Sequence, residues 1–298
     1  MSKFLRKLWM MVIPIFFLFG GNVIAAEGEA HHGLSQSAPV IFELPLPGGI
    51  EIPFSNSLIM LFLAVLTISV VVWLGTKKMA LIPGKMQNAI EWVVESLYSF
   101  VESLIGPKLT QRYFWYFGTV FLLVLVSNYM GLLPGVGTIT YNGEPLFRGA
   151  NADMNVTMFL GFSYAILWFV WSIREQGIKH FILHLFGPKG NMTGFLNIVL
   201  IPVFIFVGCV EVLSICIRPI ALGARLFGNV YAGETIIETM SLMTPEVVWN
   251  VFCILPFLFM ELLVGFIQAL VFLLLTAIFL KLQVGDEDES HESTEEAS

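Results

Sequence analysis

Charged side chains lie within segments of this sequence that are otherwise apolar. Glu211, Arg218 and Arg225 are seven residues apart, which places them on one face of a helix with 3.6 residues per turn. Ionisable residues inside membrane spans cost roughly 2.5–3.5 kcal/mol each, so they are functional candidates by default. The guanidinium of Arg225 stays charged at any working pH and cannot pass a proton itself. It could pair with a carboxylate on a neighbouring chain and make that carboxylate release its proton.

A second polar stripe follows Arg225 on the same expected helix. Asn229 comes four residues later and extends the face of Arg225. Glu234, by contrast, lies about 180° around the helix axis from Arg225. Glu238 is one turn beyond Glu234 and shares its face. These spacings predict two polar surfaces on opposite sides of one helix.

Glu261 and Gln268 supply a third polar surface, because their separation of seven residues places them on one face of the next helix. We expect Glu234, Glu238 and Glu261 to hold water and relay protons from outside to the middle of the membrane. Glu211 would do the same on the cytoplasmic side. The deep arginine would separate these two paths, so a moving carrier on another chain is required.

Simpler roles stay open at several of these positions. Arg218, beside a proline, is also placed to neutralise Glu211 or to reach lipid headgroups. Glu238 is also placed to face the water outside the membrane. Asp153 and Asn155 are residue types that favour the N-cap of a helix, which would be a purely structural role.

Membrane helices are the elements that must position these side chains. The chain is 57% hydrophobic and 12% charged, whereas a soluble domain carries roughly 25% charged residues. Its apolar residues form continuous blocks, and in lipid only helices or closed barrels satisfy the backbone. The sequence therefore predicts an all-α integral membrane protein with about five membrane helices. We place them near Leu58–Leu74, Phe114–Leu133, Val156–Ile173, Phe195–Ile217 and Val247–Leu282.

The last two of these helices are expected to be unusually long. The fourth apolar block continues with mixed apolar and charged residues to a break before Pro245, which predicts one helix over Phe195–Met243. The fifth, Val247–Leu282, would be about 54 Å long at 1.5 Å per residue, against a bilayer core of about 30 Å. The two helices must therefore be inclined, forming a hairpin with a tight turn outside. A kink is expected at Pro219, and the last helix must tilt strongly, kink at Pro256, or do both.

An amphipathic helix is expected over Pro83–Gly106. Glu91, Glu95 and Glu102 share one stripe of this segment, and apolar residues share another. Such a helix lies at the membrane interface or packs against partner subunits. The glycine–lysine pair near its start lacks the rest of a phosphate-binding loop, so nucleotide binding is not expected.

The chain divides into four expected parts. A basic start, a short apolar core and small residues near position 25 predict a signal peptide or N-terminal anchor over residues 1–26. Residues 27–57 form an extracytoplasmic segment, and residues 58–282 form the membrane domain. The acidic residues 283–298 would be a disordered cytoplasmic tail.

The distribution of basic residues predicts the orientation in the membrane. The loops at 75–113 and 174–194 carry several Lys and Arg residues, whereas the loop at 134–154 carries only Arg148. An excess of these residues marks the cytoplasmic side. The mature N-terminus would therefore lie outside and the C-terminus in the cytoplasm.

Neither the cysteines nor the histidines indicate a metal site or cofactor. Cys209, Cys216 and Cys253 lie in apolar segments without paired spacing, so we expect buried small hydrophobic side chains. His180 and His184 have the spacing of a metal pair but lie in a basic loop outside the expected spans. The sequence also lacks the basic patch with interleaved aromatics that would indicate a nucleic-acid partner.

The run RPIALGARLFGNVYAGE resembles the signature of the a subunit of F-type ATP synthases, also called subunit 6. The spacing of Glu261 and Gln268 is similar to that family as well. The resemblance covers most of the chain, through PGK-x-Q at 83–87, NYMGLLPG at 128–135 and ADMNVT at 152–157, to Leu282.

The resemblance implies a role for each matching residue. Arg225 would be the stator arginine that faces the carboxylates of a rotating c-ring. Glu211 would belong to the inner half-channel. The outer half-channel and its vestibule would comprise Asn229, Glu234, Glu261, Gln268, Asp153 and Asn155. Some members carry histidine at position 234 or 261, but here both residues are carboxylates.

The resemblance also implies partners and location. The chain would be a non-catalytic subunit, with ATP chemistry in the F1 sector. It would contact the c-ring, b-type peripheral stalk subunits and membrane lipid in a bacterial plasma membrane. The long inclined hairpin would pack against the curved side of the ring.

Two other functional classes are less consistent with the sequence. A self-contained secondary transporter would need an internal repeat and a discontinuous helix pair. An intramembrane metalloprotease would need an HExxH motif within a span. The sequence contains neither pattern. Sequence alone leaves open whether protons or sodium ions are the coupling ion.

Overall fold

The structure is a computed structural model that describes residues 38–46, 50–77, 79–80, 83–133, 136, 139–141, 144–186, 195–243 and 247–284. The expected signal peptide at 1–26 lies outside these residues, as does nearly all of the acidic tail. The long helices are α2 (Asn56–Thr76), α3 (Lys85–Ile105), α4 (Pro107–Gly131), α5 (Met154–Phe186), α6 (Phe195–Met243) and α7 (Val247–Val284). Shorter elements are β1 (Val40–Leu46), β2 (Ile50–Ser55), β4 (Thr140–Tyr141), β5 (Glu144–Pro145) and the 3-10 turn η1 (Ala150–Ala152).

The fold prediction is confirmed: the chain is an all-α integral membrane protein. Five helices are long and apolar enough to cross a membrane, lying within α2, α4, α5, α6 and α7. The expected helix over Pro83–Gly106 is present as α3. It ends where Gly106 adopts a φ of 81°, which favours glycine because it has no Cβ. Pro107 then starts α4, in the first-turn position where its missing N–H costs nothing.

The hairpin of α6 and α7 agrees closely with the sequence prediction. Helix α6 spans 49 residues and α7 spans 38, or about 74 and 57 Å. Both remain helical across their internal prolines, Pro202, Pro219 and Pro256.

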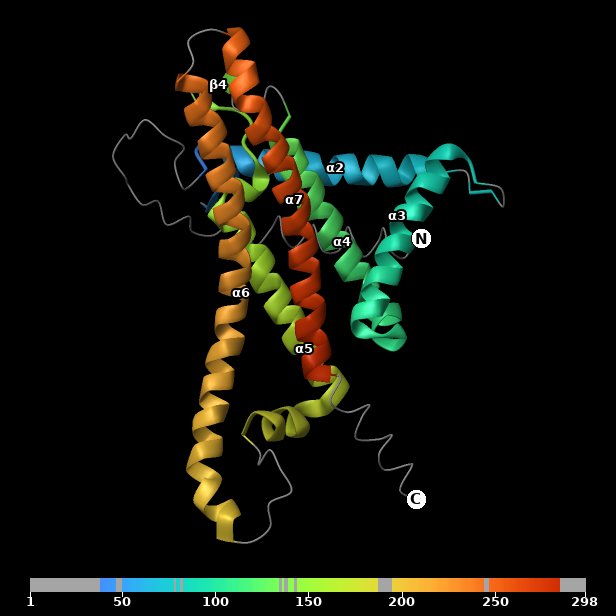
Figure 1. Cartoon of the computed structure of the whole chain (residues 1–298), viewed down its shortest axis with the longest axis vertical. Coiled ribbons are helices and arrows are strands. Elements are labelled where there is room, and N and C mark those ends of the chain that lie inside the picture. The colour runs from blue at the N-terminus through green and yellow to red at the C-terminus, as the bar shows by residue number, and fades with distance from the viewer. Residues whose placement is uncertain are drawn as a thin grey trace.

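The direction of α2 bears on how this hairpin lies in a bilayer. Figure 1 shows α6 and α7 side by side along the long axis, with α2 lying across their direction. At about 32 Å, α2 fits a bilayer core upright. Helices α6 and α7 are too long to do so and must be inclined.

Helix α5 corrects one loop prediction. The segment from residue 174, expected to be a cytoplasmic loop, stays helical to Phe186 and contains His180 and His184. A single non-helical residue, Gly177 with φ 77° and ψ 154°, divides α5 into two parts. Glycine tolerates that conformation, so the helix is interrupted at this one residue and continues after it.

Two small hairpins were not expected from the sequence. Strands β1 and β2 pair antiparallel, with Leu44 opposite Ile52, and β4 pairs with β5. The fully buried Asn56, the first residue of α2, donates a hydrogen bond of 2.9 Å from its Nδ2 to the carbonyl of Pro145 in β5. This bond ties the start of α2 to the second hairpin.

The core lies where α4, α5 and α7 meet. Tyr116 and Phe117 of α4 are almost fully buried, and Trp171 of α5 packs edge-on against Tyr116, with ring centroids 5.3 Å apart. The hydroxyl of Tyr164 donates a hydrogen bond of 2.9 Å to the carbonyl of Thr276 in α7. Aromatic packing therefore holds α5 against α4, and this hydrogen bond holds α5 against α7.

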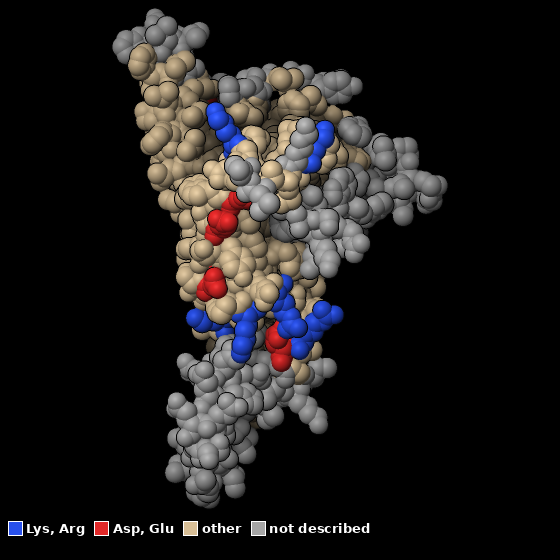
Figure 2. Space-filling view, turned by 90° about the vertical axis from the view of Figure 1, so that its right-hand side faces the viewer, with Lys and Arg blue, Asp and Glu red and all other residues tan. Residues whose placement is uncertain are grey.

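The surface is largely uncharged. Figure 2, which views the side that carries α3, shows charged side chains in a few separate groups on a surface of other residues. Cys209, Cys216 and Cys253 are exposed on α6 and α7, so the expectation that they are buried is wrong for the isolated chain. They lie on helix faces that the rest of the described chain leaves uncovered.

Candidate functional site

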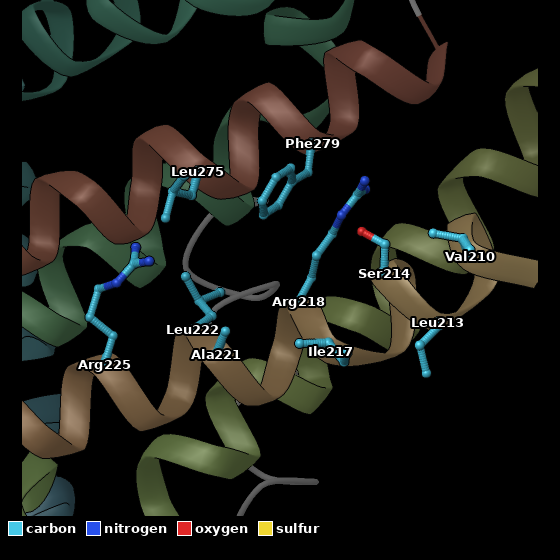
Figure 3. A pocket seen from close by; sticks show the side chains of 10 residues that line it. All are labelled: Val210, Leu213, Ser214, Ile217, Arg218, Ala221, Leu222, Arg225, Leu275 and Phe279. Atoms are coloured by element: carbon cyan, nitrogen blue, oxygen red, sulfur yellow. The ribbon is translucent and has the colours of Figure 1, made fainter. Parts of the chain in front are cut away.

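Arg225 lies on an exposed face of α6. It lines one end of a groove of about 370 Å³ between α6 and α7, together with Ala221, Leu222 and Leu275. Figure 3 shows its guanidinium directed toward α7, beside Leu275. The cation is thus presented at the surface of this chain in mainly apolar surroundings.

Arg218 lines the same groove, one heptad before Arg225. Its guanidinium carbon lies 4.6 Å from the centroid of the Phe279 ring, a cation–π distance. Figure 3 shows Arg218 and Arg225 on the same side of α6, both pointing toward α7. The stripe predicted for these two residues is confirmed. Glu211 is partly exposed on α6 but is not among the residues that line the groove.

Glu234 lies in a different environment on the other side of α6. Its side chain is 14% exposed, and its carboxylate packs against the backbone of the loop before η1. A Cβ on Gly149 would collide with this carboxylate, and one on Gly131 would lie 3.5 Å from its Oε1. The absence of side chains at Gly131 and Gly149 thus creates the space that the Glu234 carboxylate fills.

Glu261 of α7 is 5% exposed and packs against α6. Its carboxylate occupies the position that a Cβ on Gly233 would need. Gly233 immediately precedes Glu234, so the carboxylate of Glu261 contacts α6 at the residue next to Glu234.

Arg148 is a residue of this site that the sequence analysis did not select. It is 3% exposed, and its Nε lies 4.0 Å from Oε2 of Glu234. Its Nη2 donates a hydrogen bond of 3.2 Å to the carbonyl of Ala152, and its guanidinium lies 6.0 Å from the ring centroid of Tyr231. The available signal was its position as the only basic residue in the loop at 134–154.

Asp153 has the capping geometry that its sequence position allowed. It precedes α5, and its Oδ1 accepts a hydrogen bond of 2.9 Å from the backbone N–H of Asn155, as an N-cap residue does. Asp153 is 2% exposed, whereas Asn155 is exposed. Burial raises the pKa of Asp153, while the Asn155 N–H and the charge of Arg148 act against that rise.

A chain of buried amides lies beside these charges. Asn128 of α4 donates from Nδ2 to the carbonyl of Gly265 in α7 at 3.0 Å. Asn151 of η1 donates to Oδ1 of Asn128 at 2.7 Å. These bonds connect α4, η1 and α7, so the loop that carries Arg148 is fixed to the membrane helices. Asn128 was part of a motif noted in the sequence, but its contacts could not be inferred there.

The remaining candidates have intermediate exposure. Asn229 and Glu238 of α6 and Gln268 of α7 are each partly exposed. None of the three lines the groove that contains Arg225.

Gly223, two residues before Arg225, lies against α5. A Cβ on Gly223 would lie 2.8 Å from the carbonyl oxygen of Thr157 and 3.0 Å from the Cα of Met158, both in α5. Gly223 therefore allows α5 to approach, not an external helix. Gly228, by contrast, has open space where its Cβ would be.

Comparison with known proteins identifies one family. A sequence model of the family described as ATP synthase A chain matches residues 57–281. ATP synthase subunit a of Protochlamydia amoebophila is 31% identical over 242 residues, covering 79% of this chain and 83% of that protein. The same-named subunits of Ehrlichia chaffeensis and Gluconacetobacter diazotrophicus are 32% and 30% identical, covering 80% and 86% of this chain and 92% and 98% of theirs.

Proposed function

Because the chain belongs to the ATP synthase A chain family, we propose that it is the proton-conducting stator subunit of a rotary ATP synthase. In this role it passes protons to and from carboxylates on a rotating ring, and Arg225 separates the two proton paths. The subunit itself is non-catalytic, since ATP synthesis and hydrolysis take place in the F1 sector.

This proposal rests on the difference in exposure between Arg225, which is exposed, and the carboxylates of Glu234 and Glu261, which are largely enclosed. Arg225 is exposed in an apolar groove, with its cation directed along the α6–α7 surface. Charge at such a surface is costly in a membrane unless a partner supplies the opposite charge. A carboxylate on an adjacent ring would be that partner, and its pairing with Arg225 would favour loss of its proton.

The carboxylates are positioned for the outer path. Glu234 and Glu261 meet at adjacent positions of α6, near the vestibule residues Asp153 and Asn155. We assign this path to Asn229, Glu234, Glu238, Glu261, Gln268, Asp153 and Asn155. Glu211, on the other side of Arg225 along α6, is assigned to the inner path. Protons cannot pass the fixed charge of Arg225 directly, so they must be carried on the ring.

The same proposal covers orientation and partners. The basic residues at 75–113 place α3 on the cytoplasmic side, with residues 27–57 outside and 283–298 in the cytoplasm. Residues 1–26 would be a signal peptide or anchor of a bacterial plasma-membrane protein. The c-ring would contact the α6–α7 surface, and b-type stalk subunits would contact other lipid-facing helices of the 58–282 domain.

ATP-driven proton pumping in inverted membrane vesicles tests the function. Arg225→Ala is expected to abolish pumping in complexes that assemble to native levels. Arg112→Ala is the matched control, because Arg112 is an exposed arginine that pairs with Glu175 at the other end of the helix bundle. Pumping by Arg225→Ala at the level of the Arg112→Ala control would refute the proposed role.

A further inference from the structure

Resting on the proposed function, we infer that Arg148 is a positioning residue for proton uptake from outside. From the loop before η1, it holds the carboxylate of Glu234 in place and favours its ionised form. A proton that reaches Glu234 is then passed on instead of being retained.

Arg148 is buried, so it is not an ordinary surface charge. Only 3% of the residue is exposed, although basic loop residues are normally solvated. Its side chain is held against η1, because Nη2 donates to the carbonyl of Ala152 at 3.2 Å. The guanidinium therefore cannot swing into water without breaking a contact. Its Nε remains 4.0 Å from Oε2 of Glu234.

Glu234 is held from several directions. Gly149 follows Arg148 directly, and the Glu234 carboxylate fills the space beside its Cα. Arg148 is the cation that acts on Glu234, and Glu261 of α7 and Glu238 of α6 are the anions that act on it. Without Arg148, the burial of Glu234, and to a smaller extent these neighbouring carboxylates, would oppose a negative charge on it and make it retain a proton.

The second carboxylate near Arg148 has its own support. Asp153 accepts a hydrogen bond from the N–H of Asn155 and also lies within the electrostatic reach of Arg148. Its position is therefore fixed by the start of α5. Glu234 accepts a hydrogen bond from the backbone N–H of Gly149, and its Oε2 lies 4.0 Å from Nε of Arg148. Arg148 thus acts on the carboxylate of α6 at ion-pair distance.

The proton transfer balances in simple terms. An outside hydronium protonates a carboxylate oxygen of Glu234 and becomes water. The proton then leaves that oxygen for a water molecule or the carboxylate of Glu261, and Glu234 becomes an anion again. Arg148 keeps its charge throughout, so it changes the balance between these two states without taking part in the transfer.

ATP synthesis by the reconstituted holoenzyme, measured against the pH of the outer-side compartment, tests this inference. The inner pH and the membrane potential are held constant. Arg148→Gln is expected to move the half-maximal pH upward by about one unit and to lower the maximal rate severalfold. Arg148→Lys, which keeps the cation, should restore a midpoint close to native. Arg112→Gln removes an exposed arginine elsewhere and should leave the midpoint unchanged.

Two further variants separate this role from a structural one. In a Glu234→Gln background, replacing Arg148 with Gln should not shift the midpoint further, because the residue through which Arg148 acts has been removed. If Arg148→Gln fails to assemble, Arg148→Met keeps the apolar stem and carries the same expected shift.

The outcomes are distinguishable from failure of the proposed function. A native midpoint in an assembled Arg148→Gln or Arg148→Met complex overturns the inference. An equal shift in the presence and absence of the Glu234 carboxylate also overturns the inference about Arg148. In either case the proposed function survives if Arg225→Ala still abolishes pumping. Normal pumping by Arg225→Ala would remove the basis of both proposals.

Discussion

Replacing Gly223 with alanine is expected to force α6 away from α5 and to disturb Arg225, two residues later. The new Cβ would lie 2.8 Å from the carbonyl oxygen of Thr157 and 3.0 Å from the Cα of Met158. Ordinary van der Waals contact begins at 3.4 Å, so the helices must separate by roughly 0.6 Å. Both obstructing atoms belong to the backbone and cannot move aside by a rotamer change.

The magnitude follows from overpacking, which costs typically about 1–3 kcal/mol. Alanine also favours a helix over glycine by up to about 1 kcal/mol, so a second glycine must serve as reference. Gly118→Ala in α4 is suitable, because its Cβ would meet the flexible Phe114 side chain at 3.4 Å. Taking about 2–4 °C per kcal/mol, the temperature of thermal inactivation of Gly223→Ala should fall about 2–12 °C below that of the reference.

ATP-driven pumping is the functional readout for the same pair of variants. At matched assembly, Gly223→Ala should pump more slowly than Gly118→Ala, because the displaced segment of α6 carries Arg225. Equal inactivation temperatures and equal pumping would show that the approach of α5 at Gly223 does not determine the position of Arg225.

Two other substitutions test separate features. Gly228→Leu should leave the chain stable in the membrane, because the Cβ position of Gly228 is open. It should reduce the amount of ring subunit that co-purifies. Undiminished co-purification would mean that the ring does not approach α6 at Gly228. Asn128→Leu removes the hydrogen bond to the carbonyl of Gly265 and the 2.7 Å bond from the amide of Asn151, which keeps only its 3.4 Å bond to the carbonyl of Val124. At about 1–3 kcal/mol, this loss should lower the temperature of thermal inactivation by several degrees, and an unchanged temperature would contradict the importance of this amide chain.

The membrane helices could be predicted because their signals are local. Continuous apolar blocks, the break before Pro245 and the length of the last segment led to α6 and α7 with nearly their observed bounds. The seven-residue spacing likewise placed Arg218 and Arg225 on one face. Helical periodicity is sufficient for these conclusions, since residues on one helix have a fixed relation to one another.

The contacts between elements could not be predicted, because they depend on how distant segments meet. Sequence spacing gives no indication that Arg148 is buried against Glu234, 86 positions later. It also cannot distinguish Gly223, which admits α5, from Gly228, which faces outward. Nor does it show that Asn56, at the start of α2, bonds across the chain to Pro145 in β5.

The arrangement of charges along α6 explains why one helix can serve both proton paths. The face that carries Arg225 is open toward a partner, whereas the face that carries Glu234 is enclosed by the loop before η1 and by Glu261. An anion on a partner could reach Arg225 without displacing any element of this chain. It could not reach the Glu234 carboxylate directly, because Gly149 and Gly131 pack against it. Under the proposed function, protons on Glu234 would therefore pass around α6 through water and α7 before a partner carboxylate accepts them. This longer route would keep the outer path separate from Arg225.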